Sequence, residues 1–178
     1  MTLAERFNKL KATPSSINEH LDTLRDYASR CESVAEFGVD IGQSTTAFLM
    51  AQPKRLISVD TCRRPEIDEI GRMVGATKWM FLHTSSLDCT LPEVDLLFID
   101  SAHCYDQLIA ELSLHHSSVR KWIGLHDTVA YGTYGEAGPP QLGITPAIEE
   151  FLARHPEWVK LEEFTHNNGL LILERING

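Results

Sequence analysis

The stretch VAEFGVDIGQSTTAFL, from Val34 to Leu49, is the most informative part of this chain. An apolar run carries a carboxylate at Glu36 and ends in two glycines, Gly38 and Gly42, before a pattern led by serine and threonine. This order predicts a strand, a tight turn and a helix, which often bind a nucleotide-like ligand. Asp40 stands where the dinucleotide fingerprint G-x-G-x-x-G has its second glycine, and no Gly-Lys-Ser/Thr follows. The stretch therefore favours a ligand that brings no pyrophosphate to the turn.

Length and composition indicate one globular domain. The chain has 178 residues, of which 43% are hydrophobic and 23% are charged, and this suits a single domain of ~100–200 residues. We expect residues 1–15 to form a frayed leader and residues 16–178 to form the domain. The formal net charge is −9 and no segment concentrates Lys and Arg, which argues against a nucleic-acid partner.

The sequence carries no signal for export or membrane insertion. The four cysteines form no C-x-x-C pair and no zinc-like spacing, so they fit reduced thiols. The N-terminal segment is charged and lacks the apolar core of a signal peptide, and no apolar run approaches the ~20 residues that cross a bilayer. We therefore expect a cytoplasmic protein with no membrane partner. Its oligomeric state, with a homodimer among the alternatives, stays open.

Short apolar runs alternate with helical patterns through most of the chain. The predicted strands are 34–39, 55–60, 79–83, 95–100 and 122–126, with predicted helices at 44–51, 66–74 and 105–119. Continuous apolar strands separated by helices are typical of a parallel sheet covered on both faces. After a further helix over 145–156, two strands flank Asn168-Gly169, a strong hairpin signal. The sequence thus predicts an α/β fold with a seven-stranded, mostly parallel sheet, a C-terminal antiparallel hairpin and helices on both faces.

Polar residues gather at the carboxyl ends of the predicted strands, where open parallel sheets bind ligands. Asp60 is placed to hold the two hydroxyls of a ribose. Glu36 and Asp40 would meet a cationic group, and the helix-start amides over 42–45 would meet a carboxylate. S-adenosylmethionine (SAM) combines a ribose, an ammonium and a carboxylate without a phosphate. The residues that we expect to bind SAM are Glu36, Gly38, Asp40, Gly42, Ser44, Thr45, Asp60, Ser85, Ser86 and Asp100.

The opening stretch resembles motif I of class I SAM-dependent methyltransferases, with Asp60 at the position of their ribose-binding acid. The blocks VDLLFIDSAHCYDQLIAEL, IGLHDT and NNGLLILER resemble, more narrowly, the small-molecule O-methyltransferase group labelled type 24 or cephalosporin-hydroxylase-like. Asp40 departs from the broad class, which has glycine there, but it fits the narrower group. The resemblance covers roughly Ser16–Arg175. It implies a Rossmann-like sheet, SAM as cofactor and methyl transfer to an oxygen of a small molecule such as a sugar or a natural-product precursor.

A second group of polar residues follows the fourth and fifth strands. We expect Asp100, His126 and Asp127 to converge, because both strand ends open into the same crevice. Two carboxylates with open positions suit Mg²⁺, whereas an imidazole shifts the preference toward Mn²⁺, Fe²⁺ or Zn²⁺. In the metal-dependent O-methyltransferases that the chain resembles, an acid after strand four and two adjacent residues after strand five bind the metal. The alternative is that Asp100 caps the next helix and Asp127 caps the next loop.

His103 and Asp100 are the candidate catalytic residues. An imidazole with a pKa near 7 can deprotonate a hydroxyl, especially one that a metal has acidified, and the resemblance implies a base three residues after the metal-binding acid. The alternative is that His103 only packs at the start of the following helix. The adjacent pair His115-His116 is expected to be solvated and remote from the crevice.

The segment Val129–Ile144 is long and rich in glycine and proline, and it directly follows Asp127. Such a segment is either a lid over the crevice or a floppy insertion. For the whole chain, the sequence favours a SAM-dependent methyltransferase that acts on a small molecule. Two alternatives remain: a metal-dependent hydrolase or hydroxylase on the same fold, and a non-catalytic nucleotide-binding module.

Overall fold

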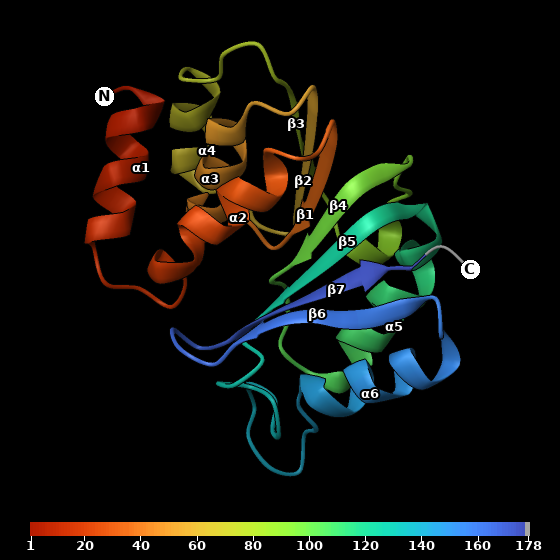
Figure 1. Ribbon diagram of the computed structural model, residues 1–178. Coiled ribbons are helices and arrows are strands. Elements are labelled where there is room, and N and C mark those ends of the chain that lie inside the picture. The colour runs from red at the N-terminus through yellow and green to blue at the C-terminus, as the bar shows by residue number, and fades with distance from the viewer. Residues whose placement is uncertain (177–178) are drawn as a thin grey trace.

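Seven strands form one sheet in the order β3-β2-β1-β4-β5-β7-β6 (Figure 1). They are β1 Ser33–Phe37, β2 Arg55–Asp60, β3 Lys78–His83, β4 Val94–Ile99, β5 Val119–His126, β6 Trp158–Phe164 and β7 Leu170–Arg175. β1 to β5 pair in parallel, and β7 runs antiparallel to both β5 and β6. The computed structural model describes residues 1–176, so the last two residues of the predicted domain lie outside it. The predicted fold class is confirmed.

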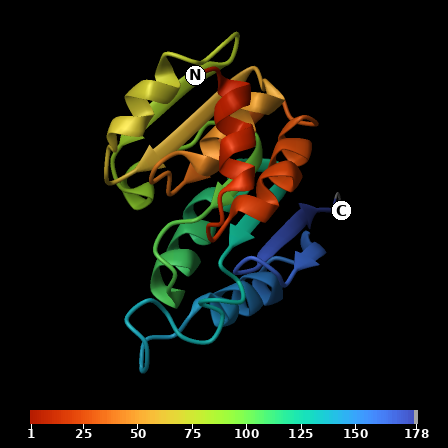
Figure 2. The same cartoon turned by 90° about the vertical axis from the view of Figure 1, so that its left-hand side faces the viewer.

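Helices cover both faces of the sheet. They are α1 Leu3–Ala12, α2 Leu21–Ala28, α3 Gln43–Ala51, α4 Pro65–Gly71, α5 Tyr105–His115 and α6 Ile144–Arg154, with short 3₁₀ segments η1 Asn18–His20, η2 Ser86–Asp88 and η3 His116–Ser118. α1 to α4 lie on one face, and α5 and α6 lie on the other (Figures 1 and 2). Every residue of β1 and β4 is buried, as a central parallel strand between two helical layers requires. Among residues 1–176, no helix is long and apolar enough to cross a membrane.

The N-terminal segment is ordered, and the prediction of a frayed leader is wrong for it. Leu3–Ala12 forms α1, which begins with a capping box between Thr2 and Glu5. Phe7 is buried in the core that α2 and α3 share, and Arg6 donates from Nε to Thr46 Oγ1 at 3.1 Å. The apolar face of this amphipathic helix packs against α3.

Gly38 joins the ends of three strands. Its N–H donates to Val59 O at 3.0 Å, and the N–H of Asp100 donates to Phe37 O at 2.8 Å. Gly38 has φ +82°, and a Cβ at this position would lie 1.9 Å from the backbone oxygen of Asp100. Only glycine tolerates both the backbone conformation and this approach. The close packing brings Asp60 and Asp100 to one edge of the sheet.

The pair His115-His116 is not solvated, which corrects the expectation from sequence. His115 is buried, its Nε2 lies 2.8 Å from Ser86 O, and its ring packs edge-on against Phe37. His116 is half-buried and its ring packs against Phe151. Both histidines therefore take part in the packing of α5 against the sheet and α6.

Candidate functional site

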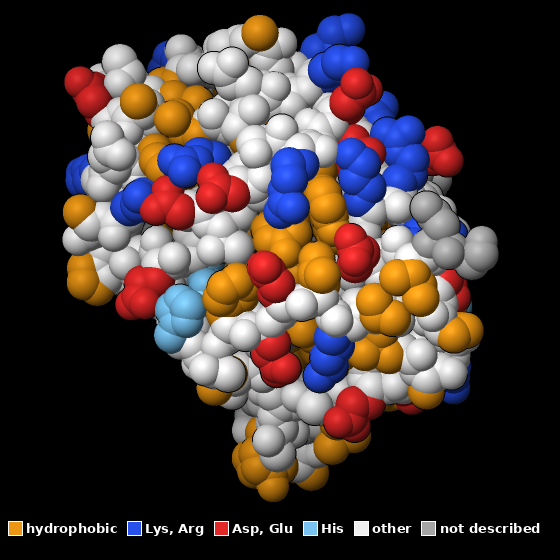
Figure 3. All heavy atoms as spheres, viewed as in Figure 1, with side chains coloured by type: hydrophobic (Ala, Val, Ile, Leu, Met, Phe, Trp, Pro, Cys, Tyr) orange, Lys and Arg blue, Asp and Glu red, His pale blue; other side chains and the backbone are white. Residues whose placement is uncertain are grey.

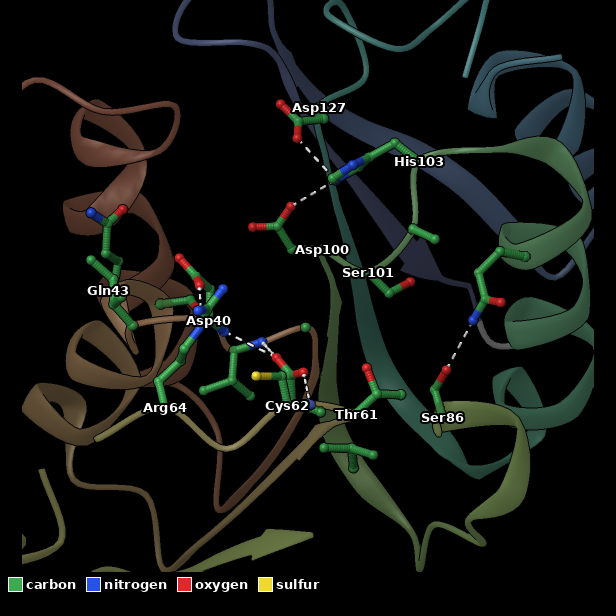
Figure 4. A pocket seen from close by; sticks show the side chains of 18 of the residues that line it. Asp40, Gln43, Thr61, Cys62, Arg64, Ser86, Asp100, Ser101, His103 and Asp127 are labelled. Carbon is green, nitrogen blue, oxygen red and sulfur yellow. Dashed lines mark hydrogen bonds and ion pairs between the residues drawn. The ribbon is translucent and has the colours of Figure 1, made fainter. Parts of the chain in front are cut away.

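A cavity of about 470 Å³ opens at the carboxyl ends of β1 to β5 (Figure 4). This volume lies in the usual range for small-ligand sites, ~300–1,000 Å³. The predicted site residues that line it are Gly38, Asp40, Ser44, Asp60, Ser85, Ser86, Asp100, His103 and Asp127. The cavity lies where open parallel sheets bind ligands, at the carboxyl ends of the strands; we call this expectation the strand-end rule. Four predicted residues do not line the cavity: Glu36, Gly42, Thr45 and His126.

Asp60 lies on the cavity wall and also fixes the turn after β1. Its Oδ2 accepts from the amides of Val39 at 2.7 Å and Asp40 at 3.0 Å, and its Oδ1 accepts from the amide of Cys62 at 2.7 Å. A carboxylate offers about four acceptor positions, so these three bonds leave capacity for a hydroxyl. The geometry is compatible with the ribose contact expected at this residue.

Glu36 does not face the cavity. It is fully buried, and its carboxyl group accepts from the hydroxyls of Ser44 at 2.8 Å, Thr45 at 2.6 Å and Ser58 at 2.5 Å. Burial raises the pKa of Glu36 to about 7, against the opposing effect of the three hydroxyl bonds. Glu36 and Thr45 thus hold the start of α3 onto β1, and neither offers a free group to a cationic ligand.

The turn between β1 and α3 takes its shape from three residues with positive φ, which are Gly38, Asp40 and Gly42. Gly42 is the N-cap of α3 with φ +76°, and a Cβ there would lie 2.3 Å from Ile70 Cδ1. Its role is therefore to bring α3 and α4 together. Asp40, with φ +46°, is exposed and accepts from Arg64 Nε at 3.1 Å. Its carboxylate already has a cationic partner in this structure.

Three carboxylates surround His103 at the other end of the cavity. Its Nε2 lies 3.1 Å from Asp100 Oδ1 and 2.9 Å from Asp127 Oδ2, and Figure 4 shows the imidazole between these two aspartates. Its Nδ1 lies 2.6 Å from Glu136 Oε1, and its ring stacks on Tyr131 with 4.8 Å between centroids. Both ring nitrogens of His103 therefore lie within hydrogen-bond distance of carboxylate oxygens.

The charges in this cluster favour a protonated imidazole. Burial lowers the pKa of His103, but the bonds to Asp100 and Asp127 outweigh burial and raise this pKa to about 11. Burial raises the pKa of both aspartates, but the bonds to His103 and His126 bring it below its usual range. At neutral pH, His103 is thus an imidazolium between carboxylates. In this arrangement it has no free nitrogen to accept a proton.

His126 lies behind the cavity wall, which corrects its expected role as a metal ligand. It is 1% exposed, with Nδ1 3.1 Å from Asp100 Oδ1 and Nε2 3.1 Å from the carbonyl oxygen of Ser16. Burial lowers the pKa of His126, but the bonds to Asp100 and Asp127 raise it to about 9. Because His126 is buried and does not line the cavity, its ring nitrogens are not presented to a cation there.

A different trio has the arrangement that a cation needs. Asp100, His103 and Asp127 each place a ligand atom within 4.8 Å of the other two. The Oδ1 atom of Asp127 is buried and has no hydrogen-bond partner among the described residues. Two carboxylates and an imidazole are donors that suit Mg²⁺, Mn²⁺ or Zn²⁺. These residues fit a divalent cation, with His103 in place of the expected His126.

Sequence reasoning missed Ser101, Gln107 and Glu111 beside the cavity, and Glu136 beside His103. Ser101 and the predicted Ser86 donate to the buried carboxyl group of Glu111, at 2.7 and 2.6 Å, and Gln107 donates to both Ser86 and Glu111. Gln107 and Glu111 lie one helical turn apart on α5, a spacing that could have indicated this pair. Glu136, in the segment 129–144, could not be paired with His103 from sequence, because their contact depends on how that loop folds.

The long segment after β5 packs beside His103. The N–H of Tyr105 donates to Leu142 O at 3.0 Å, and Tyr134 and Leu142 form an isolated bridge within the segment. The hydrophobic side chains at the lower tip of the molecule belong to this part of the fold (Figure 3). The segment therefore contacts His103 through Glu136 and Tyr131. It contributes no residue to the cavity lining, and Tyr134 and Leu142 are half-exposed.

The His103 cluster predicts a pH-dependent stability. Because the folded-state pKa of His103 lies above the ~6.5 of an unfolded histidine, its contribution is complete below that value and is lost as the pH rises toward about 11. We expect His103→Gln to lower the free energy of unfolding most near pH 6 and least near pH 10. Urea unfolding of both proteins in EDTA at pH 6, 8 and 10 measures this difference. A difference in the free energy of unfolding that stays constant over this range would contradict the ion pairing. His166→Gln, at an exposed histidine, serves as the control.

Comparisons with known proteins show the fold. No family model matches the chain, and no curated protein matches it. Solved structures similar to it include an O-methyltransferase from Bacillus cereus in complex with S-adenosylhomocysteine (SAH), with TM-score 0.69, 14% identity, and coverage of 97% of this chain and 90% of that chain. SAH-bound methyltransferase PaMTH1 from Podospora anserina has TM-score 0.63, 16% identity and coverage of 98% and 88%. Burkholderia thailandensis 1,6-didemethyltoxoflavin-N1-methyltransferase, also with SAH, has TM-score 0.63, 14% identity and coverage of 88% and 80%. The chain therefore shares the fold of these methyltransferases.

Proposed function

We propose that this chain is a SAM-dependent methyltransferase that acts on an oxygen of a small molecule, as the type 24 group does. The observation that carries the proposal is the cavity at the strand ends, with Asp60 at the end of β2 and Asp100 directly after β4 on its wall. The shared fold with SAH-bound enzymes supports it. The four cysteines are free, which supports the cytoplasmic location that belongs to the same proposal.

The proposal assigns each part of the cofactor to one part of the cavity. Asp60 accepts from a ribose hydroxyl at the acceptor position that its three backbone bonds leave free. The turn from Gly38 to Ser44 faces the amino-acid part, where amides at the start of α3 attract a carboxylate. Ser85 and Ser86, after β3, border the remaining part of the ligand, and Glu111 fixes the hydroxyl of Ser86.

Asp100, His103 and Asp127 form the part of the cavity assigned to the acceptor. Methyl transfer needs the acceptor oxygen in line with the methyl group, so precise positioning supplies much of the rate enhancement. Asp100 and Asp127 accept hydrogen bonds from a hydroxyl, and His103 holds these carboxylates in place. A divalent cation held by the same three residues would lower the pKa of an acceptor hydroxyl. A cation held by Asp100 and Asp127 alone would instead leave His103 free to act as a base, which a coordinated imidazole could not do.

We expect SAM and SAH to raise the melting temperature of the protein and NAD to leave it unchanged. The amides of Val39 and Asp40 already donate to Asp60, so they are not free to bind a pyrophosphate at the turn. A ligand at ~100 times its Kd stabilises the folded state by roughly 2.7 kcal/mol. Differential scanning fluorimetry with SAM, SAH, NAD and ATP measures the shifts. Stabilisation by NAD or ATP instead of SAH would favour a different nucleotide-binding function.

A substitution at Asp60 tests the proposed contact with the ribose. Asp60→Ala removes the acceptor and should weaken SAH binding by about 1–3 kcal/mol. Isothermal titration calorimetry on protein that circular dichroism shows to be folded measures this loss. The exposed Asp88→Ala is the matched control. If Asp60→Ala binds SAH as tightly as the wild type, the ribose lies elsewhere.

A further inference from the structure

A second cluster of metal-binding side chains lies outside the candidate active site. His116 is the first residue of η3, directly after α5, and His155 follows α6. Glu157 precedes β6. Because α5 and α6 pack side by side on one face of the sheet, the ends of both helices meet there (Figure 1). The cluster lies at the opposite end of the 11-residue α5 from His103, a distance of ~16 Å along the helix.

The ligand atoms of these three residues are already close together. His155 Nδ1 lies 3.2 Å from Glu157 Oε1, and His116 Nδ1 lies 3.9 Å from the same oxygen. The two imidazole rings are 4.1 Å apart between centroids, and all three ligand atoms lie within 4.8 Å of one another. A tetrahedral metal with ligands at ~2.0–2.1 Å separates them by roughly 3.4 Å. The two distances to Glu157 lie within about 0.5 Å of this value, and the distance between the two imidazole ligand atoms, at most 4.8 Å, lies within ~1.4 Å of it.

His116 offers a ring nitrogen that no protein group uses. Its Nδ1 is buried and has no hydrogen-bond partner among residues 1–176. Glu157 Oε1, the nearest ionisable oxygen, is 3.9 Å away, beyond hydrogen-bond distance. A metal binds the deprotonated nitrogen of an imidazole, and this nitrogen gives up no hydrogen bond in doing so.

The surroundings leave room for one more ligand. The side chains of His116, His155 and Glu157 are 16%, 28% and 33% exposed, so water can reach the cluster from one side. On the other side the ring of Phe151 packs against both imidazoles. Arg175 lies close enough to lower the pKa of His116 and opposes a cation. The carboxylate of Glu157 offsets that charge.

We propose that His116, His155 and Glu157 bind one divalent cation of the Zn²⁺ type, with water as the fourth ligand. Two imidazoles and one carboxylate form a donor set that Zn²⁺ accepts in tetrahedral geometry. The ion links the end of α5, the end of α6 and the start of β6. Binding to the folded state alone stabilises the protein in proportion to ln(1 + [Zn²⁺]/Kd). This site does not depend on the proposed methyltransferase activity.

The test is a Zn²⁺ competition titration against a chromophoric chelator, with untagged, metal-free protein at pH 7.5. The Asp127→Asn background removes the cation site at the other end of α5. We expect one equivalent of Zn²⁺ to bind in this background. Because loss of an outer partner alone costs ~10–100-fold in affinity, Glu157→Gln and His155→Ala should weaken binding at least ~10-fold.

Two further measurements separate loss of the metal site from loss of folding. Glu157→Gln preserves shape at a partly exposed position, so circular dichroism should show a folded protein even if His155→Ala fails to fold. Co²⁺ in place of Zn²⁺ should give the visible absorption of a tetrahedral site, and Glu157→Gln should reduce it. His166→Ala, at an exposed histidine, should leave both signals unchanged. The proposal is overturned if Zn²⁺ fails to compete with the chelator, or if Glu157→Gln and His155→Ala bind it as tightly as their parent.

Discussion

Gly38→Ala is expected to lower the free energy of unfolding by at least ~4 kcal/mol, or to prevent folding. Gly38 has φ +82°, a conformation that costs an alanine about 1–2 kcal/mol. The added Cβ would lie 1.9 Å from the oxygen and 2.5 Å from the carbonyl carbon of Asp100. These are backbone atoms of β4, so no side-chain rotation relieves the overlap. The ends of β1 and β4 would have to separate.

Urea unfolding at pH 7 measures this loss against a matched glycine. Gly75 has no atom within 4 Å of an added Cβ and no positive φ, so Gly75→Ala should change stability by less than ~1 kcal/mol. Total stabilities of small domains are about 5–15 kcal/mol, so Gly38→Ala removes a large share. A Gly38→Ala protein within about 1 kcal/mol of the wild type would show that the turn after β1 is not packed as described.

Asp127→Asn is expected to reduce methyl transfer by ~10²–10⁴-fold, the usual worth of a positioned catalytic group. Asp127 Oδ2 lies 2.9 Å from His103 Nε2, and its Oδ1 is buried without a partner among the described residues. Asparagine removes the charge and replaces one acceptor with a donor that faces the imidazolium. Both the position of His103 and the acceptor contacts are lost.

The measurement is the rate of SAH formation with an acceptor found by screening small hydroxyl compounds. SAH affinity should be nearly unchanged, because Asp127 faces the acceptor end of the cavity. Asp106→Asn, at an exposed position on the first turn of α5, is the control and should keep the wild-type rate. Equal rates for Asp127→Asn and the wild type would remove this residue from the reaction.

The fold could be predicted because its signals are local. Apolar strands alternate with helical patterns, and Asn168 and Gly169 have φ +69° and +93°, as the hairpin signal requires. The ordered α1 was missed although its capping box, Thr2 with Glu5, is visible in the sequence. The apolar surface that α1 buries lies on α2 and α3, and a local pattern does not show this partner.

The sequence predicted which residues lie at the carboxyl ends of the strands, but not the orientation of their side chains. The strand-end rule places Asp60, Asp100 and Asp127 at one edge, but it does not say which way a side chain points. Glu36 lies within β1 and faces α3, where three hydroxyls hold it. His126 turns toward the carbonyl of Ser16, which is 110 residues away in the sequence. Both orientations are set by contacts between distant segments.

Crystals of the protein grown or soaked with SAH test the central claim most directly. The account predicts one SAH molecule in the cavity, with a ribose hydroxyl within ~3.2 Å of the Asp60 carboxylate and the sulfur directed toward the Asp100, His103 and Asp127 cluster. An empty cavity at saturating SAH, or SAH bound at another surface, would contradict it.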